Sequence, residues 1–303
     1  MTAQAEIRQP GVLRHRRRTG IRSRLGLAIL LIAATVAVLL PFIWVISLSF
    51  TPNGETFGEP SLIPAHPTFE NYVTAFVDAN LGRALINSAI VATTAVLTNS
   101  LFAVMAGYAF AMLPFPGHKP LFYLLMATAA IPGAVTMIPL FLIARGIPLM
   151  GGNDILGHGG TGLLNTLAGV VLPYLVGPMS IFLARQFFTA GPKELAEAAR
   201  VDGASELRIF FSIYVPLSRP LIAVVAIFAF VAVWDDFLWP LVVTNTPAAQ
   251  TVQLALTRFM SDGNIQFGPL MAGTIIATLP VLIVFLFNQR SFISGLNDGA
   301  IKG

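Results

Sequence analysis

Long apolar runs alternate with short polar segments along this chain, and the length of these runs decides the fold class. A helix needs roughly 20 apolar residues to cross a bilayer core of about 30 Å, and six runs meet this length. They lie near residues 25–50, 86–113, 121–144, 164–187, 221–243 and 270–288. Each run is continuous rather than alternating, which excludes the strands of a membrane barrel. The pattern predicts an all-α membrane protein with six transmembrane helices.

The composition supports lipid rather than water around these runs. The chain has 303 residues, of which 55% are hydrophobic and only 11% are charged, whereas a soluble domain carries about 25% charged residues. Cysteine is absent, which excludes disulfides, a thiol nucleophile and thiolate metal ligands.

The distribution of Lys and Arg predicts the orientation in the membrane. If the N-terminus lies inside, only Arg83, Arg145 and Arg258 of the 18 basic residues fall in outer segments. Basic residues are retained on the cytoplasmic side, so we expect both termini to be cytoplasmic.

The basic N-terminus is interpreted as a topogenic tail, not as a nucleic-acid-binding arm. The run that follows it is also too long for the apolar region of a cleavable signal peptide. The chain then divides into three parts: a cytoplasmic tail at 1–24, a membrane domain at 25–289 and a second cytoplasmic tail at 290–303.

Residues 188–220 form the longest inner connection between two runs, and they are densely charged. The charged residues at its centre are Glu197, Arg200, Asp202, Glu206 and Arg208. Two interpretations of this loop remain open at this point: a contact surface for a cytoplasmic partner, or a solvated hairpin that merely joins two helices.

Local signals in this loop predict two short helices. Pro192 suits a first helical position, and Gly203 fits the left-handed residue that ends a helix. Ser205 can then cap a second helix, which runs through Ile213 toward Pro216.

The fifth run contains the unusual stretch WDDFLWPL, residues 234–241. A carboxylate at the bilayer centre costs about 2.5–3.5 kcal/mol on insertion scales, so Asp235 and Asp236 are expected to face a watery cavity or a polar partner. On a helix they would point about 100° apart, so that only one need face the cavity. Trp234 and Trp239 fit either a platform for a sugar ring or an interfacial belt.

Several common chemistries have no support in the sequence. No Walker A stretch occurs, so a phosphate-binding loop is not expected in this chain. The histidines are scattered without metal-ligand spacing. Residues 157–162 spell G-x-G-x-x-G, but this stretch lies in an outer loop and Phe182 stands where a dinucleotide site needs an acid.

The inner loop resembles the EAA loop of ABC importer membrane subunits. The pattern E-A-A-x3-G-x9-I-x-L-P is matched from Glu197 to Pro216, except that Val215 replaces the family's leucine. The remaining chain is similar to the six-span permease subunits of maltose-type carbohydrate importers. Supporting stretches are Asn87-Ser88, YAFAMLPFPG, GLLNTLAG, WDDFLWPL and GLNDGAIKG.

Two departures from that family stand out. Asp235 occupies a position where most relatives carry Asn, and the glycine-rich insertion around residues 148–160 is longer than usual. The first departure bears on what a cavity at this position would prefer to bind.

The resemblance implies the permease fold of type I ABC importers and gives several residues a role. The residues expected to couple to an ATPase are Glu197, Ala198, Ala199, Asp202, Gly203, Ile213 and Pro216. Those expected along the translocation path are Trp234, Asp235, Asp236 and Asn87. Those of the tail, expected near the ATPase interface, are Gly299, Lys302 and Gly303.

The resemblance also implies partners and a location. The expected complex contains a homologous permease, two ATPase subunits that bind ATP and magnesium, and an extracytoplasmic protein that binds the sugar. It lies in the plasma (inner) membrane of a bacterium or archaeon, surrounded by lipid. This chain itself is expected to be no enzyme and to hold no cofactor or metal.

Three rival functions remain open. The same architecture can serve a polyol, glycerol phosphate or an oligosaccharide derivative. An ion-coupled secondary transporter would use the intramembrane carboxylates as proton relays. An intramembrane enzyme is the third, and the absence of paired catalytic groups argues against it.

Overall fold

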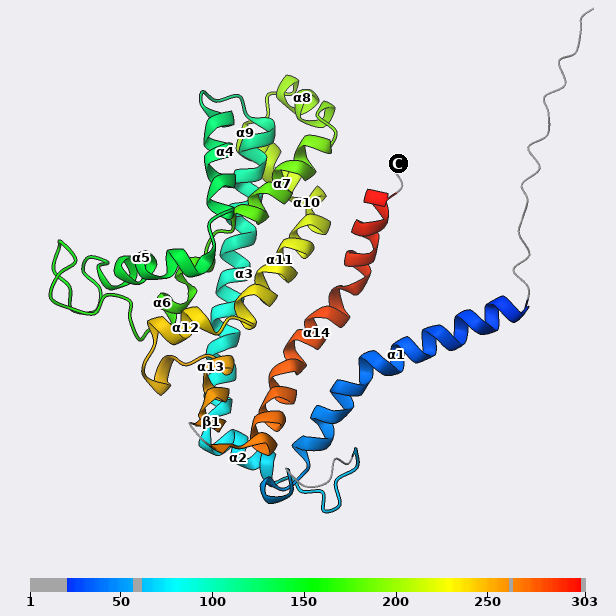
Figure 1. Ribbon diagram of the computed structural model, residues 1–303. Helices are drawn as coiled ribbons and strands as arrows, with labels where there is room; N and C mark the ends of the chain where they lie inside the picture. Colours follow the sequence, from blue (N-terminus) through cyan, green and yellow to red (C-terminus); the bar gives the residue numbers. More distant parts are fainter. Residues whose placement is uncertain (1–20, 57–61, 262–263, 301–303) are drawn as a thin grey trace, which may run out of the picture. The chain divides into compact units, whose positions relative to one another are not determined.

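The computed structural model describes residues 21–56, 62–261 and 264–300. Two compact units are distinguished by their internal contacts, one ending at Val45 and the other beginning at Ile46. The first unit consists of most of α1 (Ile21–Ser49), an apolar helix that contains Pro41. The second unit contains all the other described helices and strands (Figure 1).

The elements of the second unit are helical, apart from one pair of two-residue strands among the described residues. The first half contains η1 (Asn53–Glu55), α2 (Glu70–Asp78), α3 (Leu81–Met112), α4 (His118–Ala129), α5 (Gly133–Arg145), α6 (Leu167–Val171), η2 (Leu172–Tyr174) and α7 (Pro178–Ala190). The inner loop contains α8 (Glu194–Val201), α9 (Glu206–Ile209), the π-helical η3 (Phe210–Tyr214) and α10 (Val215–Leu217).

The last third completes the membrane region. It contains α11 (Arg219–Trp234), α12 (Leu238–Val243), η4 (Pro247–Ala249), α13 (Val252–Leu256), η5 (Thr257–Phe259), β1 (Met260–Ser261), β2 (Asn264–Ile265) and α14 (Phe267–Ala300). The two strands pair antiparallel, with Met260 opposite Ile265 and Ser261 opposite Asn264.

Six membrane crossings fit the described helices only if some crossings are broken. Three helical stretches are long and apolar enough by themselves: Leu25–Ser49, Leu81–Met112 and Phe267–Gln289. Three further crossings require bent pairs of helices: His118–Ala129 with Gly133–Arg145 at 103°, Leu167–Tyr174 with Pro178–Ala190 at 43°, and Glu206–Leu217 with Arg219–Trp234 at 74°. Helical membrane architecture is therefore confirmed. The bend in the fourth run lies between Pro173 and Pro178, two prolines that predict a kink there, whereas the length of the runs did not predict the other two bends.

The break between α4 and α5 has a cause in the sequence. Pro132 disfavours a helical conformation for the residue before it, and Ile131 lies outside both helices. Pro132 itself then occupies the cap position of α5.

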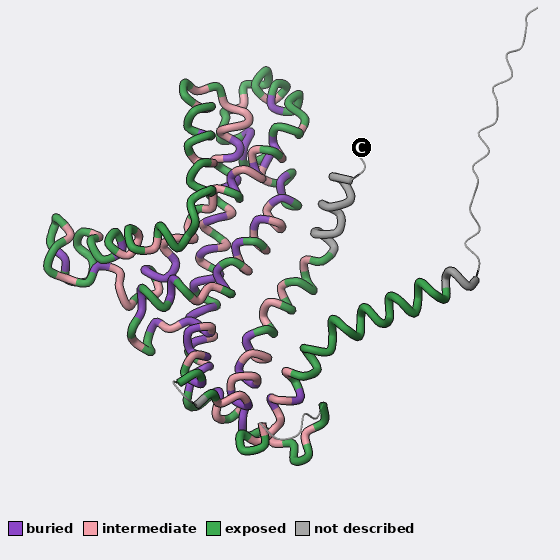
Figure 2. Tube along the Cα trace, in the orientation of Figure 1, coloured by how far each residue is buried: buried purple, intermediate pink, exposed green. Residues whose placement is uncertain are grey.

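The core of the second unit lies along α3, which packs against α7 and α11. In Figure 2 the buried residues follow these three helices, while much of α4 and α5 is exposed. The approach of α3 to α7 depends on Gly107, because a Cβ at this position would collide with the side chain and backbone of Ala184. Many exposed side chains on α4 and α5 are apolar, among them Leu124 and Ile138, as expected for surfaces that face lipid or other membrane subunits.

Candidate functional site

The first helix of the inner loop, α8, ends as the sequence predicts, but Pro192 lies two residues before its first residue, Glu194, and does not occupy a helical position. The helix carries Glu194 in its first turn and Arg200 in its last, an arrangement that complements the helix dipole. Gly203 has φ +79°. Its N–H donates to the carbonyl of Arg200 at 3.0 Å, and the N–H of Ala204 donates to the carbonyl of Ala199 at 2.9 Å. These two bonds form a Schellman motif, so the predicted glycine termination is confirmed.

The second helix also starts at its predicted cap but changes its geometry before Pro216. The Ser205 hydroxyl accepts a hydrogen bond from the Arg208 N–H at 3.4 Å. The helix then widens into a π-helical stretch, in which the Val215 N–H donates to the carbonyl of Phe210. Pro216 has no N–H to offer to the carbonyl of Ser212, which gives a local reason for the wider turn.

Helix α8 has one face toward the protein and one toward solvent. Ala196 is fully buried against the aromatic cluster formed by Phe188, Phe210 and Tyr214. Glu197 and Val201 lie four residues apart on another side of the helix and are exposed, Val201 to 88%. Val201 therefore leaves an apolar side chain uncovered at the end of a charged helix.

The other residues expected to couple to an ATPase differ in their accessibility. Ala198, Asp202, Gly203 and Pro216 are exposed, whereas Ala199 and Ile213 are half-buried. Ile213 packs against the same buried cluster as Ala196. Its contacts are therefore within the chain.

A single carboxylate, that of Glu206, accepts hydrogen bonds from both α8 and the membrane helix α3. Glu206 Oε1 accepts a hydrogen bond from Arg200 Nε at 2.6 Å, and Glu206 Oε2 accepts one from the Tyr108 hydroxyl at 3.0 Å. No sequence pattern assigned a role to Tyr108, which lies 98 residues from Glu206 along the chain.

The base of the loop is tied separately. The Tyr214 hydroxyl donates to the carbonyl of Pro192 at 3.0 Å, a bond across 22 residues. Both ends of the loop are thus held to one aromatic cluster.

The two carboxylates of the fifth run lie in a break between helices, and not on one continuous helix as the sequence predicted. Asp235 caps the end of α11 and is exposed, and α12 begins only at Leu238. Asp236 is half-buried, and its Oδ1 accepts a hydrogen bond from the Leu238 N–H at 3.1 Å. The break therefore gives this carboxylate a backbone partner that a continuous helix would not supply.

The other oxygen of Asp236 accepts a hydrogen bond from the Tyr174 hydroxyl. Both side chains line a cavity of about 310 Å³, together with Thr136, Met137 and Trp239. Tyr174 also lines a second, mainly apolar cavity of about 640 Å³ between α3, α7 and α11. A tyrosine–carboxylate pair therefore lies where the two cavities share a wall.

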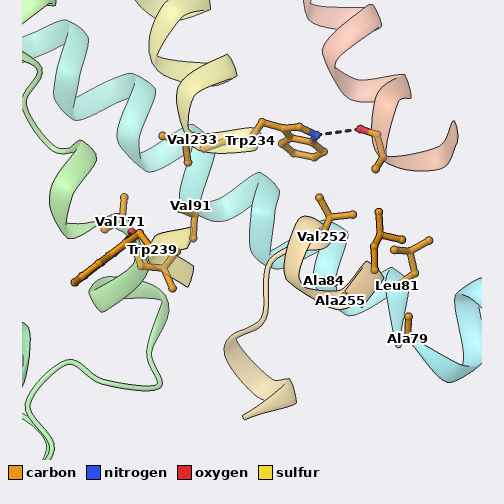
Figure 3. Close-up of a cluster of buried hydrophobic side chains, with 14 of the residues drawn as sticks. Ala79, Leu81, Ala84, Val91, Val171, Val233, Trp234, Trp239, Val252 and Ala255 are labelled. Carbon is orange, nitrogen blue, oxygen red and sulfur yellow. Dashed lines mark hydrogen bonds between the residues drawn. The ribbon is translucent and has the colours of Figure 1, made fainter. Parts of the chain in front are cut away.

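The two tryptophans of this stretch are packed inside the unit. The Trp234 indole N–H donates to the carbonyl of Ala277 at 3.0 Å, as the dashed line in Figure 3 shows. The Trp239 N–H donates to the carbonyls of Gly169 and Val170, each at 3.1 Å. Both side chains are buried, which favours a packing role for Trp234 over an open sugar platform or an interfacial belt.

Asn87 is also held by the protein itself. Its side-chain amide donates to the carbonyls of Ala248 at 3.0 Å and Gln250 at 2.9 Å. These bonds fasten the segment before α13 to α3, so Asn87 acts here as a tie between elements.

Three expected residues belong to the C-terminal tail. Gly299 lies within α14, whereas Lys302 and Gly303 lie outside the described residues. Within the described residues, no group of three His, Cys, Asp or Glu side chains is arranged to hold a metal ion.

Known proteins resemble this chain over most of its length. The diacetylchitobiose uptake system permease protein NgcG of Streptomyces coelicolor is 32% identical over 277 residues, which is 90% of this chain and 87% of the relative. The trehalose transport system permease protein SugB of Mycobacterium tuberculosis is 35% identical over 271 residues, 88% of this chain and 93% of the relative.

Solved structures show the same fold. A chain of a bacterial ABC transporter involved in the import of the acidic polysaccharide alginate superposes with a TM-score of 0.75 at 22% identity. The match covers 89% of this chain and 98% of that chain.

A family match covers α7, the inner loop and the carboxylate break together. Residues 99–294 match the family described as binding-protein-dependent transport system inner membrane component. The chain therefore belongs to this family of inner-membrane transport permeases.

Proposed function

We propose that this chain is the sugar permease of an ATP-driven, binding-protein-dependent ABC importer, and that its substrate is a disaccharide or a short oligosaccharide. Family membership supports the permease role. The substrate class is supported by the relatives, whose names refer to diacetylchitobiose, arabinooligosaccharides and trehalose.

The proposed mechanism rests on one observation: α8 has one buried side and one exposed side. Its buried side, at Ala196, fixes it to the membrane helices, while Glu197 and Val201 face outward. A short helix that is rigidly held and exposes both charge and an apolar side chain suits a cleft on a soluble partner. That partner is an ATPase subunit, which binds ATP and magnesium and hydrolyses the nucleotide.

The proposed complex contains further subunits that supply energy, the other half of the path and the substrate. It has no phosphate-binding loop of its own, so two ATPase subunits supply the energy. A homologous permease supplies the other half of the path, and an extracytoplasmic binding protein delivers the sugar. Both termini and the loop at 188–220 lie on the cytoplasmic side of the membrane, as the distribution of Lys and Arg supports.

The path through this subunit passes the cavity beside Asp236. A carboxylate accepts hydrogen bonds from sugar hydroxyls, and the neighbouring Tyr174 offers a hydroxyl and an aromatic ring. Asp235 is exposed at the same break, so both carboxylates remain within the proposed path.

Reconstitution of the whole complex tests this function. Proteoliposomes that contain both permeases and the ATPase should import sugar only when ATP is inside and the loaded binding protein is outside. A panel of disaccharides, polyols and glycerol phosphate identifies the substrate class. Uptake by this chain alone, driven by an ion gradient, would contradict the proposal and favour a secondary transporter.

A further inference from the structure

The side chains of Tyr108 in α3, Arg200 in α8 and Glu206 in α9 are joined by hydrogen bonds. We call this group the Glu206 junction. Arg200 contributes two hydrogen bonds, from Nε to Oε1 at 2.6 Å and from Nη2 to Oε2 at 3.3 Å. Tyr108 contributes the third, to Oε2 at 3.0 Å. Oε1 therefore accepts a hydrogen bond from the loop alone, whereas Oε2 accepts one from the loop and one from the membrane helix.

The partners of Glu206 differ sharply in how firmly they are held. The side chains of Arg200 and Glu206 are 37% and 43% exposed, and an ion pair at this exposure contributes little to stability by itself. Tyr108 is buried, and its ring lies 5.1 Å from that of Phe210 and 5.2 Å from that of Tyr214. The Tyr108 hydroxyl therefore gives the exposed ion pair a rigid point of attachment.

Ile209 of α9 is fully buried in the same cluster as Tyr108, but the packing of α9 on α3 is interrupted beside Glu206. A cavity of about 200 Å³ lies beside the junction, lined by Tyr108, Glu206, Met105, Leu207 and Phe210. Where α9 and α3 are separated by a cavity, the carboxylate is the direct polar link between them.

We propose that Glu206 is a positioning residue that transmits movement of α8 to α3, an inference that rests on the proposed docking of α8 on an ATPase. When α8 is displaced, Arg200 moves with it. The ion pair then moves Glu206, and the hydrogen bond to Tyr108 moves the end of α3. Because α3 packs against α7 and α11, a shift of its end reaches the helices that line the cavity at Tyr174. The docking surface and the junction then have separate tasks: one receives the ATPase and the other passes on its movement.

A purely structural role for Glu206 predicts a different outcome. If Glu206 only stabilised the loop, its loss would lower ATPase binding, ATP hydrolysis and sugar uptake in proportion. If it transmits movement, an assembled complex continues to hydrolyse ATP but imports less sugar for each ATP. The ratio of ATP hydrolysed to sugar imported separates these roles.

The test uses the complete reconstituted complex with Glu206→Gln and Tyr108→Phe. The first variant removes the charge that holds Arg200, and the second removes one hydroxyl while keeping the aromatic ring. Asp78→Asn is the control, since it neutralises an exposed carboxylate of α2, outside the inner loop. We expect the ATP-to-sugar ratio to rise about fivefold or more in both junction variants and to stay unchanged in the control.

Two further results distinguish a break in the Glu206–Tyr108 link from a failure of the variants to assemble. The double variant should be no worse than Glu206→Gln alone, because both changes break the same link. If Glu206→Gln does not assemble, Tyr108→Phe decides, since its ring packing is intact. An unchanged ratio in assembled Tyr108→Phe and Glu206→Gln complexes overturns the inference.

A docking variant distinguishes failure of this inference from failure of the proposed function. Glu197→Lys changes the outward face of α8 and leaves the junction intact. Reduced ATPase copurification with Glu197→Lys, together with a normal ratio in Glu206→Gln, means that docking stands and the junction has no role in transmission. Normal assembly and uptake with Glu197→Lys would instead contradict the docking surface itself.

Discussion

The Tyr174 hydroxyl donates a hydrogen bond to the carboxylate of Asp236, which lies 62 residues further along the chain. This bond joins the end of η2 to the break between α11 and α12, and both residues line the same cavity. Two interruptions in otherwise apolar helices therefore meet at a polar contact. Irregular backbone at membrane depth is tolerated where it is buried in protein or lines a cavity.

Loss of this bond should slow sugar uptake without preventing assembly. A hydrogen bond to a charged group contributes about 1.5–3 kcal/mol, so Tyr174→Phe and Asp236→Asn should each reduce uptake about tenfold or more. Tyr123→Phe, which alters an exposed ring, serves as the control. Transport at the normal rate in both variants of the pair would exclude a role for it in the path.

The contact of α3 with α7 should be sensitive to a single methyl group. Gly107→Ala places a Cβ against Ala184, and such overpacking typically costs about 1–3 kcal/mol. We expect a lower midpoint of thermal unfolding for the purified permease in detergent. Gly133→Ala is the control because the space around that Cβ is open, and an equal midpoint for both variants would contradict the close packing.

Trp239 should contribute to stability through its indole N–H. Trp239→Phe keeps an aromatic ring but leaves the carbonyls of Gly169 and Val170 without this donor, which should cost about 1–3 kcal/mol. The measurement is again the midpoint of unfolding in detergent. Trp44→Phe changes a partly exposed tryptophan and should have a smaller effect; the reverse order would contradict the assignment of Trp239 to the core.

The orientation of the chain can be tested by cysteine labelling, since the native sequence contains no cysteine. His66 is exposed in the segment before α2, which we expect to lie outside, and Arg208 is exposed in the loop at 188–220, which we expect to lie inside. In intact cells an impermeant thiol reagent should label His66→Cys, and Arg208→Cys should react only after the membrane is opened. The opposite pattern would reverse the assignment of both termini to the cytoplasm.

Local structure in the inner loop was predictable because its signals are local. Gly203 ends α8 and Ser205 caps α9 within a few residues of the bonds that they make. The partners of Glu206 and Asp236 were not predictable in this way. Tyr108 and Tyr174 lie 98 and 62 residues away, and no local pattern distinguishes them from other tyrosines.

The breaks after α4 and α11 were missed for a different reason. Run length measures how apolar a segment is, but not whether its backbone continues as a helix. Pro132 marks the break after α4, and the adjacent carboxylates Asp235 and Asp236 mark the one after α11. Each of these signals is short compared with the roughly 20-residue window that identifies a crossing.

The turn at Gly203 tests most directly whether α8 couples an ATPase to transport. No atom lies within 4 Å of a Cβ built on Gly203, so the strain of a substitution comes from its φ of +79° alone. Asn tolerates this conformation, whereas a β-branched residue there is a genuine outlier. Gly203→Val should therefore distort the end of α8, and Gly203→Asn should preserve it.

The decisive measurement is sugar uptake together with ATP hydrolysis stimulated by the loaded binding protein, in reconstituted complexes of these two variants. With a strain of roughly 1–3 kcal/mol at this turn, we predict that Gly203→Val loses most uptake and either ATPase copurification or stimulated hydrolysis. Gly203→Asn should remain close to the native complex, and the affinity of the binding protein for sugar should be the same throughout. Normal assembly, stimulation and uptake with Gly203→Val would show that the inner loop is only a connector between membrane helices.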